Sequence, residues 1–210
     1  MNRLAEHSVV TPSGGSRPYR WLVAIAVAAC AGTGLAGRSA AQEVKTDYER
    51  KAMILYNFAR YTEWPKSAFA SDKAPFVLGI LGKDPFGKDV GIIKDKTVRG
   101  RRIEVRYFTT VEEFKECHLL FIAKSEMQNL ARILKRLENL NTLTTAEEAQ
   151  GFIEQDGIIN LVRNRKPNGT ETVEFEVNLL AAEKANLKLD NQLLKLAKKV
   201  KTYHSPKATP

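Results

Sequence analysis

The sequence predicts an α/β fold: a single-domain three-layer sandwich whose sheet is mostly parallel, with an antiparallel carboxyl-terminal hairpin at its edge and helices on both faces. Apolar, strand-like runs alternate with helix-like segments through the middle of the chain, which is typical of parallel β-α-β units. Two strand-like segments near the carboxyl terminus flank an Asn-Gly turn, which indicates a hairpin. The hydrophobic content of 43% is that of a globular protein.

Residues 1–41 are expected to be a signal peptide. Arg17 and Arg20 precede an uncharged apolar run at 21–37, and the small residues at 39–41 form a cleavage site. The apolar run is shorter than the roughly 20 residues that cross a bilayer, which disfavours a membrane anchor. The sequence therefore predicts export from the cytoplasm.

A lipid anchor is the alternative for the same segment. The residues VAAC at 27–30 resemble a lipoprotein box, which would make a lipidated Cys30 the mature amino terminus. The apolar stretch before Cys30 is short, which favours cleavage after Ala41. Either way the protein leaves the cytoplasm, and we expect the α/β domain at 42–202 and a polar tail at 203–210.

The net charge of +9 does not indicate a nucleic-acid partner. Export places nucleic acid out of reach, and Lys and Arg are interspersed with Asp and Glu, as on a solvated surface. After cleavage Cys117 is the only cysteine, so a disulfide within the chain is excluded. We interpret Cys117 as a small buried residue, with a bridge between chains as the alternative.

The first helix is expected at 42–65, within which residues 51–65 read KAMILYNFARYTEWP. Pro65 disfavours helical geometry at Trp64 and so predicts the end of this helix, which the Trp64 ring is expected to close. The apolar side chains sweep a broad arc of the helical wheel, which is typical of a helix mostly buried beneath a sheet.

Side chains on this helix divide into two sides. Phe58 and Tyr61 are expected in the core. Asn57 and Arg60 fall on the polar side, with Tyr56 at its edge. If the helix contacts a partner, Tyr56, Asn57 and Arg60 are the residues expected to do so.

Turn and cap signals place the elements that follow. Asp84-Pro85 predicts a helix start, with a capping residue followed by proline at the first position. Capping boxes at 110–113, 125–128 and 145–148 predict further helix starts, and Leu130, Ile133, Leu134 and Leu137 recur at helical spacing after the second box. Strands are expected at 76–82, 101–108, 117–123, 142–145, 157–164 and 172–178, the last two joined through Asn168-Gly169.

Two helices are expected to close the domain, the second at 190–201. This second segment is basic and amphipathic, a pattern that suits binding to anionic lipid. A helix docked on the sheet with its lysines outward explains the pattern as well, and we favour that interpretation.

No arrangement of residues predicts a reaction, a metal site or a cofactor. His118 and Cys117 point to opposite faces of a strand, so they cannot chelate one ion together. The glycines at 79, 82 and 87 match neither a dinucleotide fingerprint nor a P-loop, and there is no Gly-x-Ser-x-Gly elbow. We therefore expect a binding or regulatory protein, not an enzyme.

The motifs of the chain resemble those of the YfiR-like family of periplasmic proteins over roughly residues 45 to 200. They are KAMILYNFARYTEWP, LGKDPFG, the turn at 98–101, CHLLFI, GFIEQDGIINLV and FEVNLLAAEKANLKLDNQLLKLA. The chain has Asp156-Gly157 where the family usually has Gly-Gly, and Asn191 replaces a common Ser. It also lacks the additional cysteines of some members, which argues against disulfide-linked assembly.

The resemblance assigns a set of signature residues, which we interpret as scaffold. They are Tyr56, Asn57, Phe58, Trp64, Pro65, Asp84, Pro85, Phe86, Asn160, Phe175 and Asn178.

The resemblance implies a periplasmic protein that binds the sensor domain of an inner-membrane diguanylate cyclase and holds it inactive, which lowers cyclic-di-GMP and so controls biofilm formation. It also allows a homodimer, and a histidine kinase as the membrane partner instead. A separate hypothesis is a small-ligand binder that uses a crevice at the carboxyl ends of the strands, near residues 82–86.

Overall fold

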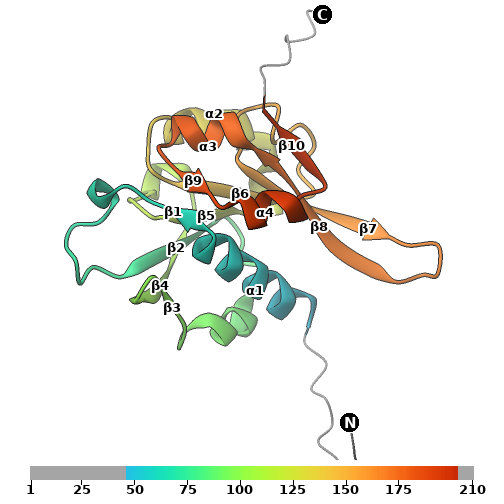
Figure 1. Cartoon of the computed structure of the whole chain (residues 1–210), viewed down its shortest axis with the longest axis horizontal. Helices are drawn as coiled ribbons and strands as arrows, with labels where there is room; N and C mark the ends of the chain where they lie inside the picture. Colours follow the sequence, from blue (N-terminus) through green and yellow to red (C-terminus); the bar gives the residue numbers. More distant parts are fainter. Residues whose placement is uncertain (1–45, 203–210) are drawn as a thin grey trace, which may run out of the picture. The chain divides into compact units, whose positions relative to one another are not determined.

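Residues 46–202 are described in a computed structural model. The expected signal peptide, Cys30 and the tail at 203–210 lie outside the described residues. The elements, drawn in Figure 1, are α1 (Asp47–Arg60), β1 (Thr62–Glu63), η1 (Lys66–Ala68), β2 (Phe76–Leu81), η2 (Gly87–Ile93), β3 (Thr97–Val98), β4 (Arg101–Phe108), η3 (Val111–Glu113), β5 (Leu119–Ile122), η4 (Lys124–Asn129), α2 (Leu130–Leu137), β6 (Leu143–Glu147), β7 (Ile159–Arg165), β8 (Glu171–Asn178), α3 (Leu179–Lys184), β9 (Lys188–Leu189), α4 (Asn191–Leu196) and β10 (Lys199–Lys201).

The main sheet has the strand order β10-β8-β7-β6-β5-β2-β4-β3. Neighbours from β7 to β4 pair in parallel, because each crossover returns the chain to the same end of the sheet. β7 and β8 pair antiparallel as a hairpin through the predicted turn, where Gly169 has a φ of +81°. The mostly parallel sheet with an antiparallel hairpin is confirmed, and β10 extends it by one parallel strand beyond β8.

Helices cover both faces of the sheet, as predicted. On one face α1, η2, α3 and α4 enclose a core that includes Phe58, Phe121 and Ala182. On the other face α2 and η3 pack on the sheet around Leu120 and Ile133. Buried apolar residues therefore occupy two layers, one on each side of the sheet, and the three-layer sandwich is confirmed.

The first helix is shorter than predicted. It begins after Thr46, whose hydroxyl accepts the N–H of Glu49 at 3.0 Å in a capping box, and it ends at Arg60. Thr62 terminates it, because its buried hydroxyl donates to the carbonyl of Phe58 at 2.7 Å. Thr62 then pairs with β9, so a short sheet replaces the last predicted turn.

Several predicted caps serve other purposes. Ser125 does not cap a helix: its hydroxyl accepts the N–H of Lys83 at 2.9 Å, and the segment that contains it is the 3-10 helix η4. The box at 145–148 lies mostly in β6, where pairing with β5 and β7 overrides the local signal. The segment after Asp84-Pro85 is likewise a 3-10 helix, η2, instead of an α-helix. In α2, Leu130, Ile133, Leu134 and Leu137 are buried as predicted.

The last predicted helix is wrong in its second half. α4 stops at Leu196, and Lys199–Lys201 form β10 on the open side of β8. The N–H of Lys198 donates to the carbonyl of Phe175 at 2.8 Å, and the Lys198 ammonium lies 3.2 Å from Glu174. Pairing with a sheet edge and with acidic side chains there outweighs the local helical pattern.

Candidate functional site

The exposed side of α1 gathers the three residues predicted to meet a partner. We call Tyr56, Asn57, Arg60 and Lys96 the α1 patch. The Tyr56 hydroxyl donates to the carbonyl of Thr97 at 3.2 Å, which ties the ring to β3. The Arg60 guanidinium and the Lys96 ammonium each lie 5.7 Å from the centre of the Tyr56 ring.

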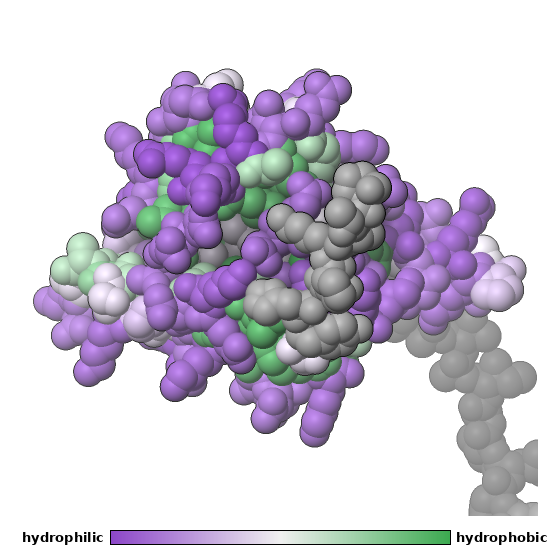
Figure 2. Space-filling model, turned by 90° about the horizontal axis from the view of Figure 1, so that it is seen from above, coloured by the Kyte–Doolittle hydropathy of each residue, from purple (hydrophilic) through white to green (hydrophobic). Residues whose placement is uncertain are grey.

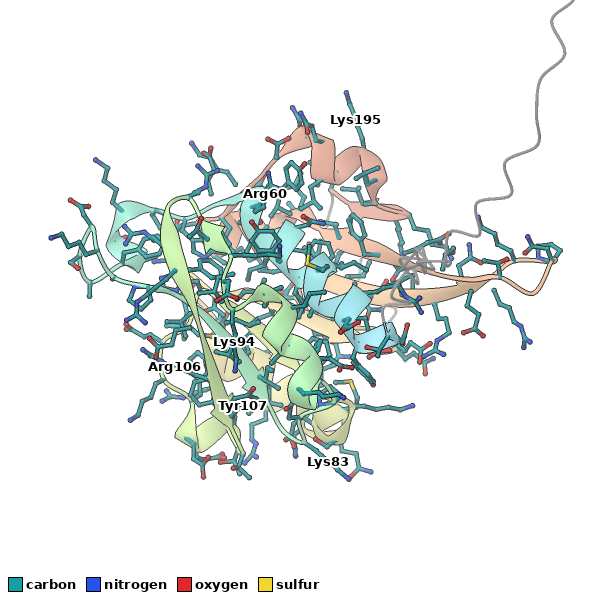
Figure 3. All side chains as sticks on the ribbon, turned by 90° about the horizontal axis from the view of Figure 1, so that it is seen from below. Arg60, Lys83, Lys94, Arg106, Tyr107 and Lys195 are labelled. Atoms are coloured by element: carbon teal, nitrogen blue, oxygen red, sulfur yellow. The ribbon has the colours of Figure 1, made fainter. Side chains whose placement is uncertain are left out.

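The α1 patch offers cations and an aromatic ring together. Arg60 is exposed, Tyr56 and Asn57 are half-buried, and Arg60 also lies 5.7 Å from the ring of Tyr61. Figure 3 shows Arg60 projecting from α1. Such a surface suits carboxylates and aromatic side chains of another protein, because both are attracted to arginine and tyrosine. Tyr61 was predicted inside the core, but it is half-buried and packs against the edge of the core.

Trp64 does not close the helix end, since α1 ends before it. Its indole N–H donates to the carbonyl of His118 at 3.1 Å, and its ring meets the ring of Phe76 edge-on at 5.0 Å. Pro65 follows in an extended conformation and directly precedes η1. Phe58 is buried and packs edge-on against Phe175 at 5.0 Å. These signature residues join α1 to the sheet.

The signature residues after β2 form a turn. The carboxylate of Asp84 accepts the N–H of Phe86 at 2.8 Å and that of Gly87 at 3.1 Å. Phe86 is buried and packs edge-on against Phe121 at 4.9 Å. Because its carboxylate already satisfies both amides, Asp84 closes this turn to an anion.

The two signature asparagines hold buried backbone groups. The side chain of Asn160 exchanges two hydrogen bonds of 3.2 Å with the backbone of Ala149. Asn178 donates to the carbonyl of Ile153 at 2.7 Å and accepts the N–H of Ala181 at 3.0 Å, which caps α3. Both fix the segment between β6 and β7 against the sheet.

Two reactive side chains lie inside the protein. The Nδ1 of His118 accepts the N–H of Val77 at 2.9 Å, and its Nε2–H donates to the carbonyl of Ala68 at 3.0 Å, so both nitrogens are used. Burial lowers the pKa of His118 to about 4. Burial also raises the pKa of the Cys117 thiol far above its usual value. A thiol that stays protonated is a poor nucleophile, so the interpretation of Cys117 as a buried residue agrees with its environment.

A buried lysine was missed by sequence reasoning. Lys51 is only 2% exposed, and its ammonium lies 2.5 Å from both Asp47 and Glu147. Burial disfavours its charge, but the hydrogen bonds with the two carboxylates outweigh this, and the pKa of Lys51 lies above its usual value. Tyr48 adds a ring 4.4 Å from the ammonium. The cluster fastens the start of α1 to the end of β6.

The predicted crevice near residues 82–86 is largely filled. A Cβ added at Gly82 would meet Ser125 at 2.5 Å and Glu126 at 2.7 Å, so η4 lies against this turn. The cavity beside it, lined in part by Pro85 and Phe121, holds about 120 Å³. Pockets that bind organic ligands have volumes of about 300 Å³ or more, so this cavity is too small for most of them.

A larger hollow lies at the other end of the strands. It holds about 400 Å³ between α2 and α3 and is lined by Leu134, Thr144, Ile158 and Lys184, among others. Figure 2, which views the molecule from the side of these helices, shows a mostly hydrophilic face with hydrophobic patches between the charged side chains. Within residues 46–202, no group of three or more His, Cys, Asp or Glu side chains is placed to hold a metal ion. In the same range, no helix is both long and apolar enough to cross a bilayer.

Comparison with known proteins gives one family. A family model described as YfiR/HmsC-like matches residues 48–198. No curated protein matches the chain. Solved structures with partial similarity include an ABC domain in complex with L-Trp from Streptococcus pneumonia (10% identity, TM-score 0.46, covering 73% of this chain and 60% of that one). Another is a conserved domain protein from Vibrio cholerae O1 biovar El Tor (10% identity, TM-score 0.48, covering 74% and 60%). The chain thus spans 60% of the length of each.

Proposed function

Because the chain belongs to the YfiR/HmsC-like family, which is a family of periplasmic regulators, we propose that it binds the periplasmic sensor domain of an inner-membrane diguanylate cyclase and represses it. Release of the sensor would raise cyclic-di-GMP in the cytoplasm. The observation that carries this proposal is the family match over 48–198, which takes in nearly all of the described residues.

The placement of the reactive side chains supports a binding role. His118 and Lys51 are each held by two hydrogen-bonding or ionic partners inside the protein, and Cys117 is buried. A catalytic group needs a free polar atom, whereas the polar atoms of Lys51 and His118 are used by protein partners and the buried Cys117 thiol stays protonated. The accessible chemistry is instead on surfaces such as the α1 patch.

Export is part of the proposal. We place cleavage after Ala41, with lipidation at Cys30 as the alternative. Mass spectrometry of the protein purified from cells decides between them: a mature chain that begins at Gln42 supports cleavage, whereas a diacylated or triacylated Cys30 supports the lipid anchor. A mature chain that retains the first residues and stays in the cytoplasm would contradict export.

The α1 patch is our proposed contact surface for the sensor. Arg60 and Lys96 present cations above an aromatic ring that is anchored to β3, so little ordering is needed when a partner binds. An acidic or aromatic patch on the sensor domain would match it.

Direct binding tests this proposal. The purified exported protein is titrated against the periplasmic domain of a membrane protein that carries a GGDEF domain and is encoded beside its gene. We expect saturable one-to-one binding per protomer. Binding only to a neighbouring histidine kinase would favour the kinase alternative, and binding to neither would overturn the proposal for both.

A small-ligand role has one observation in its favour, the hollow of about 400 Å³ between α2 and α3. Its size falls within the range of ligand pockets. A thermal-shift screen with nucleotides, amino acids and cell-wall fragments tests this role. A ligand that bound there could act together with the sensor by favouring one state of the complex.

A further inference from the structure

The outer edge of β4 is only partly covered. β3 pairs with Arg101 and Arg102, and within residues 46–202 no strand follows β3 in the sheet. From Ile103 to Phe108, β4 pairs with β2 on its inner side alone. Figure 3, seen from below, shows Arg106 and Tyr107 along this open part of β4.

The direction of the free peptide groups follows from one hydrogen bond. The carbonyl of Phe108 accepts the N–H of Gly82 at 2.8 Å, so it faces β2. Peptide groups of successive residues in a strand point to opposite sides. The N–H and C=O groups of Val105 and Tyr107 therefore point away from the sheet and can pair with another extended chain.

The open part of β4 is less protected than most sheet edges, because its two charged side chains, Glu104 and Arg106, are paired with each other. The opposite edge, β10, is short and carries Lys199 and Lys201. Lysines and short length are common protection against unwanted pairing, whereas Ile103 to Phe108 contain no lysine and no proline. Tyr107 is 54% exposed, one of two large hydrophobic side chains that are exposed among residues 46–202. An edge of this kind is suited to binding.

The side chains of the open edge differ between its two faces. Val105 packs against the core beneath α1, and Tyr107 shares that face because side chains alternate along a strand. Glu104 and Arg106 lie on the face of α2, where they form an ion pair of 2.8 Å. In a strand added to this edge, every second side chain would lie beside the apolar face of Val105 and Tyr107. The side chains between them would lie beside the charged face of Glu104 and Arg106.

The charged face continues into a basic groove. Arg106 lines an open groove of about 530 Å³, and its lining residues are Arg106, Phe114, Lys115, Glu116, Arg136 and Leu140. Three of these six are cations and one is an acid, so the groove favours carboxylates.

We propose that the open edge of β4 binds an extended segment of the partner whose side chains alternate between apolar and acidic, with the apolar ones against Val105 and Tyr107. The backbone of that segment pairs with the free peptide groups. Its carboxylates meet Arg106 and the basic groove, in a register that keeps them away from Glu104, which would repel them. This is recognition by strand addition. The identity of the segment rests on the proposed function, under which it belongs to the sensor domain.

A second copy of this chain fits the same edge poorly. A two-fold pairing centred on Arg106 would place Arg106 directly opposite Arg106 of the other copy. Like charges in that position are destabilising. One centred on Tyr107 would pair Val105 with Thr109, whose N–H already donates to the carboxylate of Glu113 at 3.0 Å. A two-fold pairing centred on Val105 would instead bring Phe108 to the place beside Arg102 that Thr97 of β3 already occupies.

A short peptide tests the edge without knowledge of the partner. The probe is acetyl-Ser-Val-Glu-Val-Glu-Val-Ser-amide, added to ¹⁵N-labelled protein. We expect chemical-shift changes centred on Val105 and Tyr107, weaker ones with the Val-Lys analogue, and none with a peptide N-methylated at alternate residues. The proposal would be overturned if the Val-Lys analogue bound equally well, or if the shift changes lay elsewhere. It would also be overturned if millimolar peptide caused no changes, or if the shifts followed protein concentration alone.

Variants of the protein separate backbone pairing from charge. Val105→Pro removes an N–H that faces away from β2, a position where edge strands tolerate proline. Val105→Thr keeps that N–H and is its control. We expect at least a tenfold loss of peptide affinity in Val105→Pro, little loss in Val105→Thr, and a reversed preference for the Lys peptide in Arg106→Glu. If Val105→Pro fails to fold, Arg106→Glu still tests the proposal. If Arg106→Glu still prefers the Glu peptide to the Lys peptide, the proposed contact is contradicted.

In cells, the outcomes distinguish this inference from the proposed function. If deletion of the gene raises cyclic-di-GMP and Val105→Pro fully restores repression, the edge is not the contact although the regulatory function stands. If deletion changes nothing, the proposed function fails, and the peptide result alone judges the edge.

Discussion

The imidazole of His118 accepts the backbone N–H of Val77 at 2.9 Å, while its other nitrogen donates to the carbonyl of Ala68 at 3.0 Å. This arrangement fixes a neutral ring with its proton on Nε2. Protonation of Nδ1 would set two N–H groups against each other, and Arg101 and Arg106 lie close enough to disfavour a further positive charge. The contact joins β2, the residue before β5 and the last residue of η1.

The fold should lose stability in acid because of His118. Burial lowers its pKa from 6.5 to about 4, so between these values the unfolded chain binds a proton that the folded chain does not. The free energy of unfolding is thus unaffected by this group above pH 6.5, falls as pH drops toward about 4, and levels off below. We expect the loss to reach about 2–3 kcal/mol, measured by urea denaturation.

His118→Gln provides the control for this pH dependence. Glutamine can accept from Val77 and donate to Ala68 but does not titrate. The difference in unfolding free energy between the native protein and His118→Gln should therefore change with pH in this window. A constant difference would show that carboxylates alone cause the acid sensitivity.

Removing one partner of the Lys51 ion pair should destabilise the fold. In Lys51→Met, Asp47 and Glu147 lose the cation between them, and Glu147 is only 15% exposed. We expect a cost of about 2–3 kcal/mol, because Glu147 is then left with only the longer contact of 3.8 Å to Arg163. The double variant Lys51→Met with Glu147→Gln should cost less than the sum of the single variants.

The exposed pair Lys135 and Glu138 is the matched control for this cycle. Their side chains are 80% and 55% exposed, and both pairs link residues by a short ammonium–carboxylate contact. Lys135→Met should leave the denaturation midpoint unchanged within error, since surface pairs contribute little. Equal effects at the two lysines would contradict the role given to burial.

Gly157 should tolerate no side chain. A Cβ added there would lie 2.4 Å from the ring of Phe152, which is fully buried and cannot move aside. Gly157→Ala should lower the unfolding free energy by about 1–3 kcal/mol. Gly91→Ala, at a position where an added Cβ meets nothing within 4 Å, should be close to neutral.

A charge reversal at Arg60 should affect binding and leave the fold intact. Arg60 is exposed and, within residues 46–202, its guanidinium contacts the rings of Tyr56 and Tyr61. Arg60→Glu should change stability by about 1 kcal/mol or less, including the loss of a cation from the last turn of α1. We expect it to weaken the sensor complex by about tenfold or more. The control is Arg132→Glu on α2, which is also exposed; an equal effect there would point to general charge attraction instead of the α1 patch.

Local patterns predict what is locally determined. The apolar runs of β2 and β5, the hairpin turn and the buried side of α2 follow from hydrophobic periodicity and turn residues. Asp156 has a φ of +69°, a conformation that glycine adopts freely, in line with the Gly-Gly that the family resemblance led us to expect at this position.

The features that the sequence did not predict depend on residues far apart in the chain. The partner of Lys51 lies 96 positions away in Glu147, and His118 meets Val77 across 41 positions. β10 exists because β8 has an open side, which no property of residues 199–201 reveals. The open edge of β4 also could not be predicted from local sequence, because it depends on β3 pairing with only two residues of β4.

The most direct test of the central claim is cytoplasmic cyclic-di-GMP, measured by mass spectrometry in cells with and without the gene. The proposed repression predicts a rise on deletion, return to the original level when the chain is supplied in trans with its export signal, and no return when it is supplied without that signal. Cyclic-di-GMP that is unchanged by deletion would contradict the account.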